Sequence, residues 1–191
     1  MEFTRKKPLI ILVAGRAGHG KSTLAKYLET IYIKSGKKVV VSPYTKYLKR
    51  ILEDIMYMKM DDNNKPRDLL QQVSSKIIKE KLGYQDFFIR RQIEDIEIYS
   101  YFTDIIIVPD VRFPEEITII KNKFPNVISI GIKRVDYISN LTIEQQQDIT
   151  EVSLDNYHEY DYKVINNNDT SLKEKAIEII ESINTRSDIN E

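Results

Sequence analysis

The sequence predicts an α/β fold with an open five-stranded parallel sheet and helices on both faces. Short apolar, β-branched runs alternate along the chain with longer segments in which apolar residues recur at helical spacing. One run, DIIIV at residues 104–108, has four consecutive apolar residues, as expected of a central strand buried on both faces. The connections are long enough for right-handed crossovers, so the strands are expected to be parallel.

Size and charge limit the classes of protein to consider. A chain of 191 residues suits one domain, residues 1–191, with a sizeable core. Basic and acidic residues balance at 29 each, so no net field favours nucleic acid or an anionic membrane. The chain has no cysteine, and its two histidines lack metal-ligand spacing. No apolar run approaches the ~20 residues of a membrane span. We therefore expect a cytoplasmic protein that binds neither nucleic acid nor membranes.

The stretch GRAGHGKS, Gly15 to Ser22, fits the pattern G-x-x-x-x-G-K-S/T in full. In that pattern glycines let backbone N–H groups turn around a phosphate, the lysine (Lys21) reaches the β and γ oxygens, and the hydroxyl of Ser22 ligates Mg²⁺. An apolar run at 9–14 precedes it, and a helix that ends at Gly36 should follow it. The alternative is a glycine-rich strand-to-helix turn with a chance lysine, but this context favours a triphosphate cradle.

The next part of the chain predicts a second strand and then an all-helical insertion. Residues 37–41 are expected to be the strand, which Ser42 and Pro43 end. Helices are then expected at 44–60, 66–83 and 86–101, with a turn at 61–66. We define the whole helical insertion as residues 44–103.

The sheet resumes after the insertion and is completed by the C-terminal part of the chain. Strands are expected at 104–108, ending at Pro109 and Asp110, at 127–132 and at 162–165, with a helix at 114–123. Residues 133–152 form a polar stretch that we interpret as a lid. A capping box at Ser171 and Glu174 begins the last helix, which should extend to Asn184 and be followed by a frayed tail.

Ligands of open parallel sheets bind at the carboxyl ends of the strands, and polar residues follow two of these ends. After the central strand, Asp110 is placed to hold Mg²⁺ or orient a reacting group, and Arg112 can bind phosphate as a fork. The alternative for this stretch is a capped helix start with a surface ion pair, since Pro114, Glu115 and Glu116 suit one. After the strand at 127–132, Arg134 is a candidate lid cation for phosphoryl transfer, or else part of a solvated edge.

A second phosphate would need fixed cations that face the phosphate loop, and the helical insertion carries several. We select Lys49 and Arg67, the latter at a helix start, with Gln71 one turn further as a contact to a base. The alternative for each of them is a solvated helix residue.

The chain resembles the deoxynucleoside monophosphate kinases of phages and bacteria, which share the P-loop kinase fold with phosphomevalonate kinases. The resemblance covers nearly the whole chain in the order GRAGHGKS, YLKRI, KPRDLLQ, IIIVPDVRFPEE, KR and ITEVSLDNYHEYDYKVINN. It implies ATP as donor, Mg²⁺ as cofactor and a small-molecule nucleotide, a deoxynucleoside monophosphate, as acceptor. Thr150 and Glu151 match the family's hydroxyl and glutamate pair, whereas Asp148 stands where the family usually has histidine.

The resemblance assigns the candidate residues to four sets. The expected donor-binding set is Gly15, Gly18, Gly20, Lys21, Ser22 and Thr23, and the expected catalytic set is Lys21, Asp110, Arg112 and Arg134. The expected acceptor set is Lys49, Arg67, Gln71, Arg112 and Glu151, and the expected metal ligands are Ser22 and Asp110.

Two alternative functions stay open at this point. One is a kinase for another phosphorylated small molecule such as phosphomevalonate, and the other is a P-loop ATPase that acts as a switch module. An aromatic cluster at Tyr99, Tyr101 and Phe102 suits either the core or a homodimer face.

Overall fold

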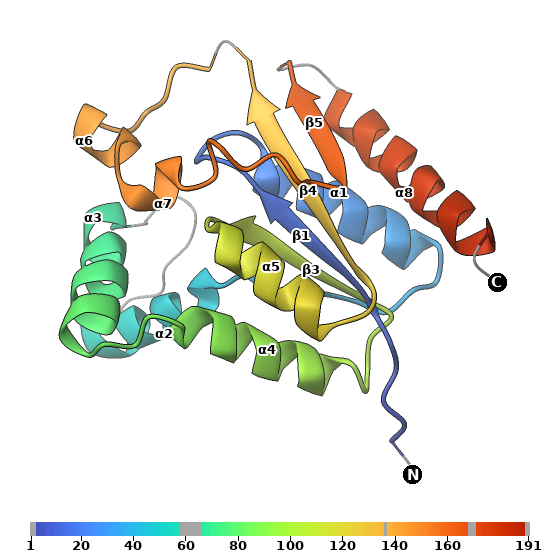
Figure 1. Ribbon diagram of the computed structural model, residues 1–191, viewed down its shortest axis with the longest axis horizontal. Coiled ribbons are helices and arrows are strands. Elements are labelled where there is room, and N and C mark those ends of the chain that lie inside the picture. Colours follow the sequence, from blue (N-terminus) through green and yellow to red (C-terminus); the bar gives the residue numbers. More distant parts are fainter. Residues whose placement is uncertain (1–2, 58–65, 136, 168–170, 190–191) are drawn as a thin grey trace.

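The computed structural model of the chain describes residues 3–57, 66–135, 137–167 and 171–189, without the side chains of Arg67, Ser171 and residues 186–189. Its centre is a five-stranded, wholly parallel sheet in the order β2-β3-β1-β4-β5 (Figure 1). The strands are β1 (Leu9–Ala14), β2 (Val39–Val41), β3 (Ile105–Val111), β4 (Val127–Arg134) and β5 (Tyr162–Asn166). The predicted sheet is thereby confirmed.

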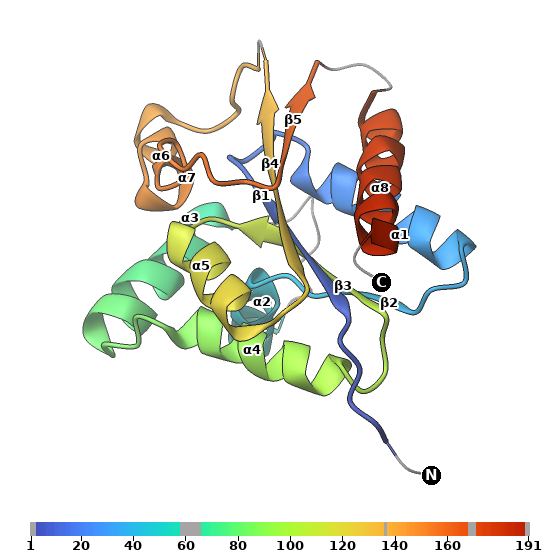
Figure 2. The ribbon, with the colours of Figure 1, turned by 45° about the vertical axis from the view of Figure 1, so that its right-hand side comes forward.

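The helices divide between the two faces of the sheet, as Figure 2 shows. One face is covered by α1 (Lys21–Lys34) and α8 (Ser171–Ile189), which pack on the odd-numbered residues of β1, such as Ile11 and Val13. The other face is covered by α4 (Phe87–Tyr99) and α5 (Pro114–Lys123), which pack on the even-numbered residues, such as Ile10 and Leu12. Burial on both faces explains why β1 and β3 are continuous apolar runs.

The helical insertion forms a small core of its own beside the sheet. It contains α2 (Thr45–Met56), α3 (Arg67–Gln71), the π-helical segment η1 (Gln72–Lys81) and α4. Leu48 and Leu52 of α2 are buried against Val73 and Ile78 of η1. In this packing α4 lies on the sheet, whereas α2, α3 and η1 form a cluster beside the carboxyl ends of β1 and β3 (Figure 1).

Several predicted boundaries are wrong. The strand expected at 127–132 continues to Arg134, so the first two residues of the expected lid belong to β4, and the strand expected at 37–41 begins at Val39. The strand expected to end at Pro109 continues to Val111, because a register shift against β1 accommodates the proline, which has no N–H to donate. The helix expected at 66–83 divides into α3 and η1, where the Leu82 amide bonds to Ile77 O at 3.0 Å. The last helix continues beyond Asn184 to Ile189, since no glycine or proline interrupts it.

The connection from β4 to β5 contains little helix. It consists of α6 (Ile143–Gln146), α7 (Ile149–Val152) and an irregular segment, residues 153–161, that passes in front of β4 (Figure 1). Among the described residues, neither α6 nor α7 contributes to the hydrophobic clusters on the sheet. One face of β4 and β5 is covered by α8, and the other lies partly beneath the irregular segment.

Candidate functional site

The phosphate loop joins β1 to α1 and has the left-handed backbone that its glycines allow. Gly15, Gly18 and Gly20 have φ angles of 147°, 74° and 104°, which side chains rarely permit. The loop is also held from β5, whose Asn166 side chain donates to His19 O at 3.0 Å. The glycine spacing in the sequence thus corresponds to a real turn.

Lys21 lies at the centre of this loop. Its ammonium group donates to Gly15 O at 2.7 Å and to Arg16 O at 2.9 Å, and the residue is only 7% exposed. A positive charge surrounded by backbone of the loop is suited to neutralise an anion that enters from the open side. Ser22 and Thr23 follow on the first turn of α1 and are exposed.

A carboxylate from the lid contacts the same loop. Glu151 of α7 accepts a hydrogen bond from the Ala17 amide at 2.7 Å, and its other oxygen accepts one from Arg112 Nη1 at 2.8 Å. The Glu151 side chain is almost fully buried, so the interaction is little screened. One carboxylate therefore occupies two donors, a loop amide and a guanidinium, of the kind that bind phosphate oxygens.

Asp110 holds the start of the helical insertion. Its Oδ1 accepts from the Tyr44 amide at 2.8 Å, and its Oδ2 accepts from the Thr45 amide at 3.0 Å and the Thr45 hydroxyl at 2.8 Å. A carboxylate at the first amides of α2 satisfies donors that would otherwise have no partner and interacts favourably with the helix dipole. Asp110 therefore connects the end of the central strand to the insertion.

Glu116 supports the backbone of Arg112 from beneath. One of its oxygens accepts from the Arg112 amide at 2.7 Å and from the Phe113 amide at 3.1 Å. Burial raises the pKa of Glu116 to about 7, although these amides and Lys79 oppose the rise. The sequence contained the signal, a glutamate two residues after a helix-starting proline, but the expected sets did not include it.

The phosphate loop, the end of β3, the insertion and the lid enclose a cavity of about 390 Å³, which we name the phosphate-loop cavity. It brings together eight expected site residues: Gly18, Lys21, Ser22, Lys49, Gln71, Asp110, Arg112 and Glu151. The insertion and the lid close over it, since Gln145 of α6 donates to Asp68 of α3 at 2.7 Å. Thr45, Ser74 and Gln145, which are not among the expected site residues, also line the cavity.

Other expected residues lie elsewhere. Arg134 does not line the phosphate-loop cavity; its guanidinium stacks 4.8 Å from the Tyr137 ring and donates to Gly18 O at 3.4 Å. The side chain of Arg67 is outside the described part of the chain. Asp148, in place of the family's histidine, accepts from the Thr150 amide and hydroxyl and so caps α7.

A second, larger cavity of about 700 Å³ lies on the other side of the phosphate loop, which we name the β4–β5 cavity. Gly15, Arg16 and His19 form one wall, and Arg134 lies in another. Burial lowers the pKa of His19, whose ring bonds to the Ile132 carbonyl and meets Tyr137 edge-on.

The described residues show no cluster of three or more potential metal-binding side chains. Within the same ranges, no helix is both long and apolar enough to cross a membrane. Of the aromatic cluster near the end of α4, Tyr99 packs in the core, whereas Tyr101 and Phe102 are exposed.

Comparison with known proteins identifies the fold. No protein-family model matches the sequence, and no curated protein matches it. Among solved structures, a variant of the Mycobacterium tuberculosis APS kinase is 13% identical, with a TM-score of 0.55 over 94% of this chain and 99% of that one. The same enzyme in complex with AMPPNP and APS is 12% identical over the same shares, with a TM-score of 0.56. Shikimate kinase from Bacteroides thetaiotaomicron has a TM-score of 0.49 at 12% identity, covering 92% of this chain and 97% of that one. The two APS kinase structures therefore show that the chain has the P-loop kinase fold.

Proposed function

We propose that the chain is an ATP-dependent kinase that transfers the γ-phosphoryl group of Mg-ATP to a nucleoside or deoxynucleoside monophosphate. The observation that carries this proposal is the composition of the phosphate-loop cavity. One wall has Lys21 and Ser22 of the loop, and the facing wall has Lys49 and Gln71 of the insertion, with Arg112 between them. Two phosphate groups need cations from two sides, and this cavity provides them.

Lys21 and the loop amides would bind the donor phosphates. Ser22 supplies a hydroxyl oxygen suited to Mg²⁺, and Asp110 supplies Oδ1, which accepts only the Tyr44 amide and so retains acceptor capacity, whereas Oδ2 accepts two bonds from Thr45. These residues fit the metal. When bound, Mg²⁺ would neutralise charge on the donor phosphates.

Arg112 would act between the two phosphates. In the structure its guanidinium is bound to Glu151, and Glu116 fixes its backbone. A phosphate monoester is already a nucleophile near neutral pH, so the chain needs to align the reactants and stabilise charge, and no strong base is required. Lys49 and Gln71 would hold the acceptor, with Lys49 on its phosphate.

The test is ADP release from ATP with a panel of acceptors, namely deoxynucleoside and ribonucleoside monophosphates, phosphomevalonate, and no acceptor. The proposal expects release that depends on one class of nucleotide. Release only with phosphomevalonate would make the chain a kinase of another phosphorylated small molecule. Release at the same rate without acceptor would support an ATPase switch module instead.

The acceptor wall has its own test. Lys49→Ala should raise the KM for the acceptor about tenfold while changing the KM for ATP little, since it removes one phosphate contact. Lys76→Ala, an exposed lysine of η1 outside the cavity, is the control. Equal effects of the two variants would remove Lys49 from the acceptor site.

A further inference from the structure

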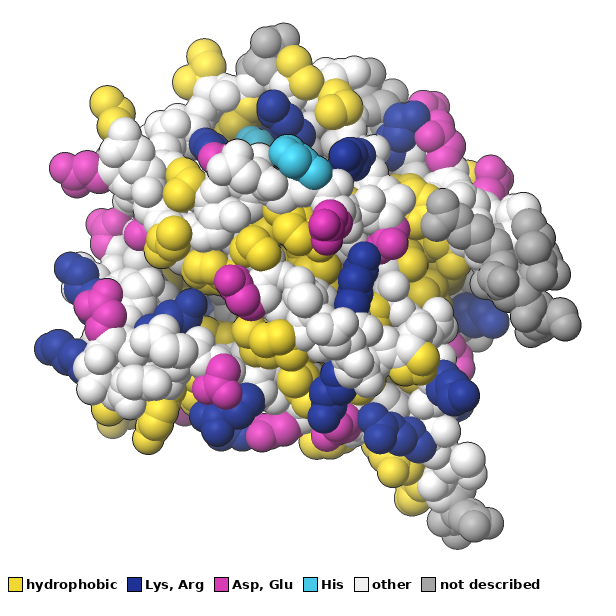
Figure 3. Space-filling model, viewed as in Figure 1, with side chains coloured by type: hydrophobic (Ala, Val, Ile, Leu, Met, Phe, Trp, Pro, Cys, Tyr) yellow, Lys and Arg dark blue, Asp and Glu magenta, His cyan; other side chains and the backbone are white. Residues whose placement is uncertain are grey.

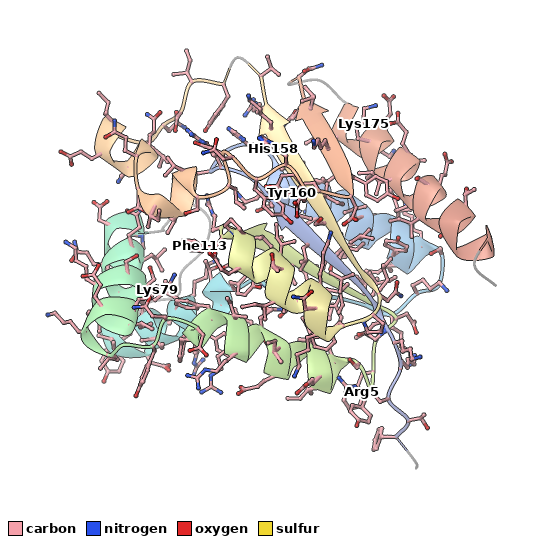
Figure 4. All side chains as sticks on the ribbon, in the orientation of Figure 1. Arg5, Lys79, Phe113, His158, Tyr160 and Lys175 are labelled. Carbon is pink, nitrogen blue, oxygen red and sulfur yellow. The ribbon has the colours of Figure 1, made fainter. Side chains whose placement is uncertain are left out.

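The β4–β5 cavity has walls from four parts of the chain. These are the outer side of the phosphate loop, β4, β5 and the irregular segment 154–160. In Figure 4, His158 and Tyr160 of that segment lie in front of β4. The crossover from β4 to β5 is irregular in this segment. Because no helix among the described residues of the crossover packs on the sheet here, the side chains of the segment pass over the sheet and leave a cavity beneath them.

Basic groups dominate the walls of this cavity. They are Arg16, Lys133, Arg134, Lys163 and both histidines of the chain, against a single carboxylate, Asp155, which is paired with Arg16. On the face seen in Figure 3, histidine and basic side chains gather over this part of the sheet. The whole chain has no net charge, so this excess of positive charge is local.

Several of these cations have no partner in the described part of the chain. The ammonium groups of Lys133 and Lys163, both exposed residues, form no hydrogen bond or ion pair with the described residues. The Nε of Arg134 is buried and has no hydrogen-bond acceptor among them. A buried donor without an acceptor is costly, and an anionic ligand in this cavity would supply one.

The remaining lining suits an aromatic group. Tyr157 and Tyr160 pack edge to face with ring centroids 4.8 Å apart, and both line the cavity. Tyr160 lies so close to Gly131 of β4 that a Cβ atom there would collide with the ring. Rings held in this way offer a base a surface to stack on. A volume of about 700 Å³ is that of a cavity for a ligand of nucleotide size.

We propose that the β4–β5 cavity is a second ligand site that binds a nucleoside phosphate, with the phosphate on Lys133, Lys163 and Arg134. It is separate from the phosphate-loop cavity, because Lys21, Ser22 and Arg112 do not line it. The proposal does not depend on the kinase reaction, since it concerns binding alone.

The first experiment is calorimetric titration of the Lys21→Met protein with ADP, GDP, CDP and dTDP in turn. Removing Lys21 weakens donor binding in the phosphate-loop cavity, and binding that Lys163→Glu then weakens belongs to the β4–β5 cavity. We expect one molecule of at least one nucleotide to bind per chain, at least tenfold more weakly when Lys163→Glu is added. Lys173→Glu, an exposed lysine of α8, should leave binding unchanged. No binding of any nucleotide, or no effect of Lys163→Glu, would overturn the proposal.

A second measurement covers the case in which Lys21→Met disturbs the loop. The phosphate-loop cavity of the otherwise unaltered chain should bind nucleotide as well, and Lys163→Glu should lower the stoichiometry by one nucleotide per chain. A stoichiometry of one that both Lys21→Met and Lys163→Glu abolish would mean that the two lysines serve a single site, and the proposal would fall. Inorganic pyrophosphate is the third arm. Pyrophosphate binding as tight as nucleotide binding would overturn the assignment of a nucleoside.

Discussion

The two cavities share the phosphate loop as a wall but differ in how their charged groups are satisfied. In the phosphate-loop cavity Lys21 bonds to loop carbonyls, Arg112 to Glu151, and Asp110 to the start of α2. In the β4–β5 cavity Lys133 and Lys163 have no acceptor among the described residues. A charged side chain that already has a partner serves to hold that partner in place. A charged side chain without a partner is available to a ligand.

The difference also concerns what a ligand must displace. A phosphate that binds Arg112 and the Ala17 amide competes with the Glu151 carboxylate, which already occupies both donors. A ligand of the β4–β5 cavity meets no such competitor on its lysines. A phosphate on these two donors would therefore displace the Glu151 carboxylate of α7, whereas a phosphate on Lys133 and Lys163 would displace no carboxylate of the described residues.

The largest expected effect comes from breaking the first cavity at its centre. Lys21→Met should reduce kcat/KM for phosphoryl transfer at least ~10³-fold, because the charge at the donor phosphates is lost. Lys26→Met, on the exposed side of the same helix, should leave the rate unchanged. Steady-state kinetics with both variants decides the point. A Lys21→Met enzyme within tenfold of the original would contradict the assignment of the loop.

The second prediction concerns Glu116, which accepts hydrogen bonds from the backbone of Arg112. The variant Glu116→Gln tests how this residue makes the stability of the chain depend on pH. The pKa of Glu116 is about 7 in the folded chain and near the ordinary 4.5 in the unfolded chain. Between these values the folded state holds the extra proton, so the contribution of Glu116 to stability falls as pH rises from about 4.5 to 7. Glutamine cannot ionise. The free energy of unfolding of the variant relative to the original should therefore rise from pH 5 to pH 8, by at most ~3 kcal/mol.

The measurement for this variant is urea unfolding at several pH values. Glu115→Gln, the exposed neighbour on α5, is the matched control and should show no such trend. A relative stability of Glu116→Gln that is constant across this range would mean that Glu116 does not titrate there.

Glu151→Gln converts a paired cation of the first cavity into one that resembles those of the second. Arg112 loses its carboxylate, so the chain should be destabilised by ~1–2 kcal/mol. Inorganic phosphate should then stabilise the variant more than the original chain, since the anion takes the vacated place. Urea unfolding with and without phosphate measures both effects, and Glu144→Gln on exposed α6 is the control. Equal gains from phosphate in the variant and the original chain would show that Glu151 does not compete for this site.

The sequence was sufficient for the sheet and for the position of the phosphate loop, for physical reasons. Buried parallel strands are apolar runs, and the phosphate loop needs glycines at fixed spacing, so both leave local signals. The pairing of Glu151 with Ala17 and Arg112 joins residues far apart in the chain, and no local pattern encodes such a contact. The same is true of Asp110 at the start of α2.

The β4–β5 cavity could not be predicted, because it forms where the crossover from β4 to β5 has, in its described residues, no helix packed on the sheet. A lysine on β5 and a histidine in an irregular segment are ordinary surface residues until the chain brings them together. Arg134 was expected in the catalytic set from its place after a strand. Its side chain turns to Tyr137 and the β4–β5 cavity, and sequence position alone does not fix that direction.

The smallest expected effect separates two roles of Asp110. Asp110→Asn keeps one acceptor at the first amides of α2 but loses the negative charge, so the free energy of unfolding should fall by ~1 kcal/mol. If Asp110 also helps to hold Mg²⁺, the Mg²⁺ concentration for half-maximal kinase rate should rise several-fold. Asp54→Asn, an exposed aspartate of α2, controls for the change of charge. Lower stability with unchanged Mg²⁺ dependence would leave Asp110 as the cap of α2 alone, a structural link between the central strand and the acceptor wall.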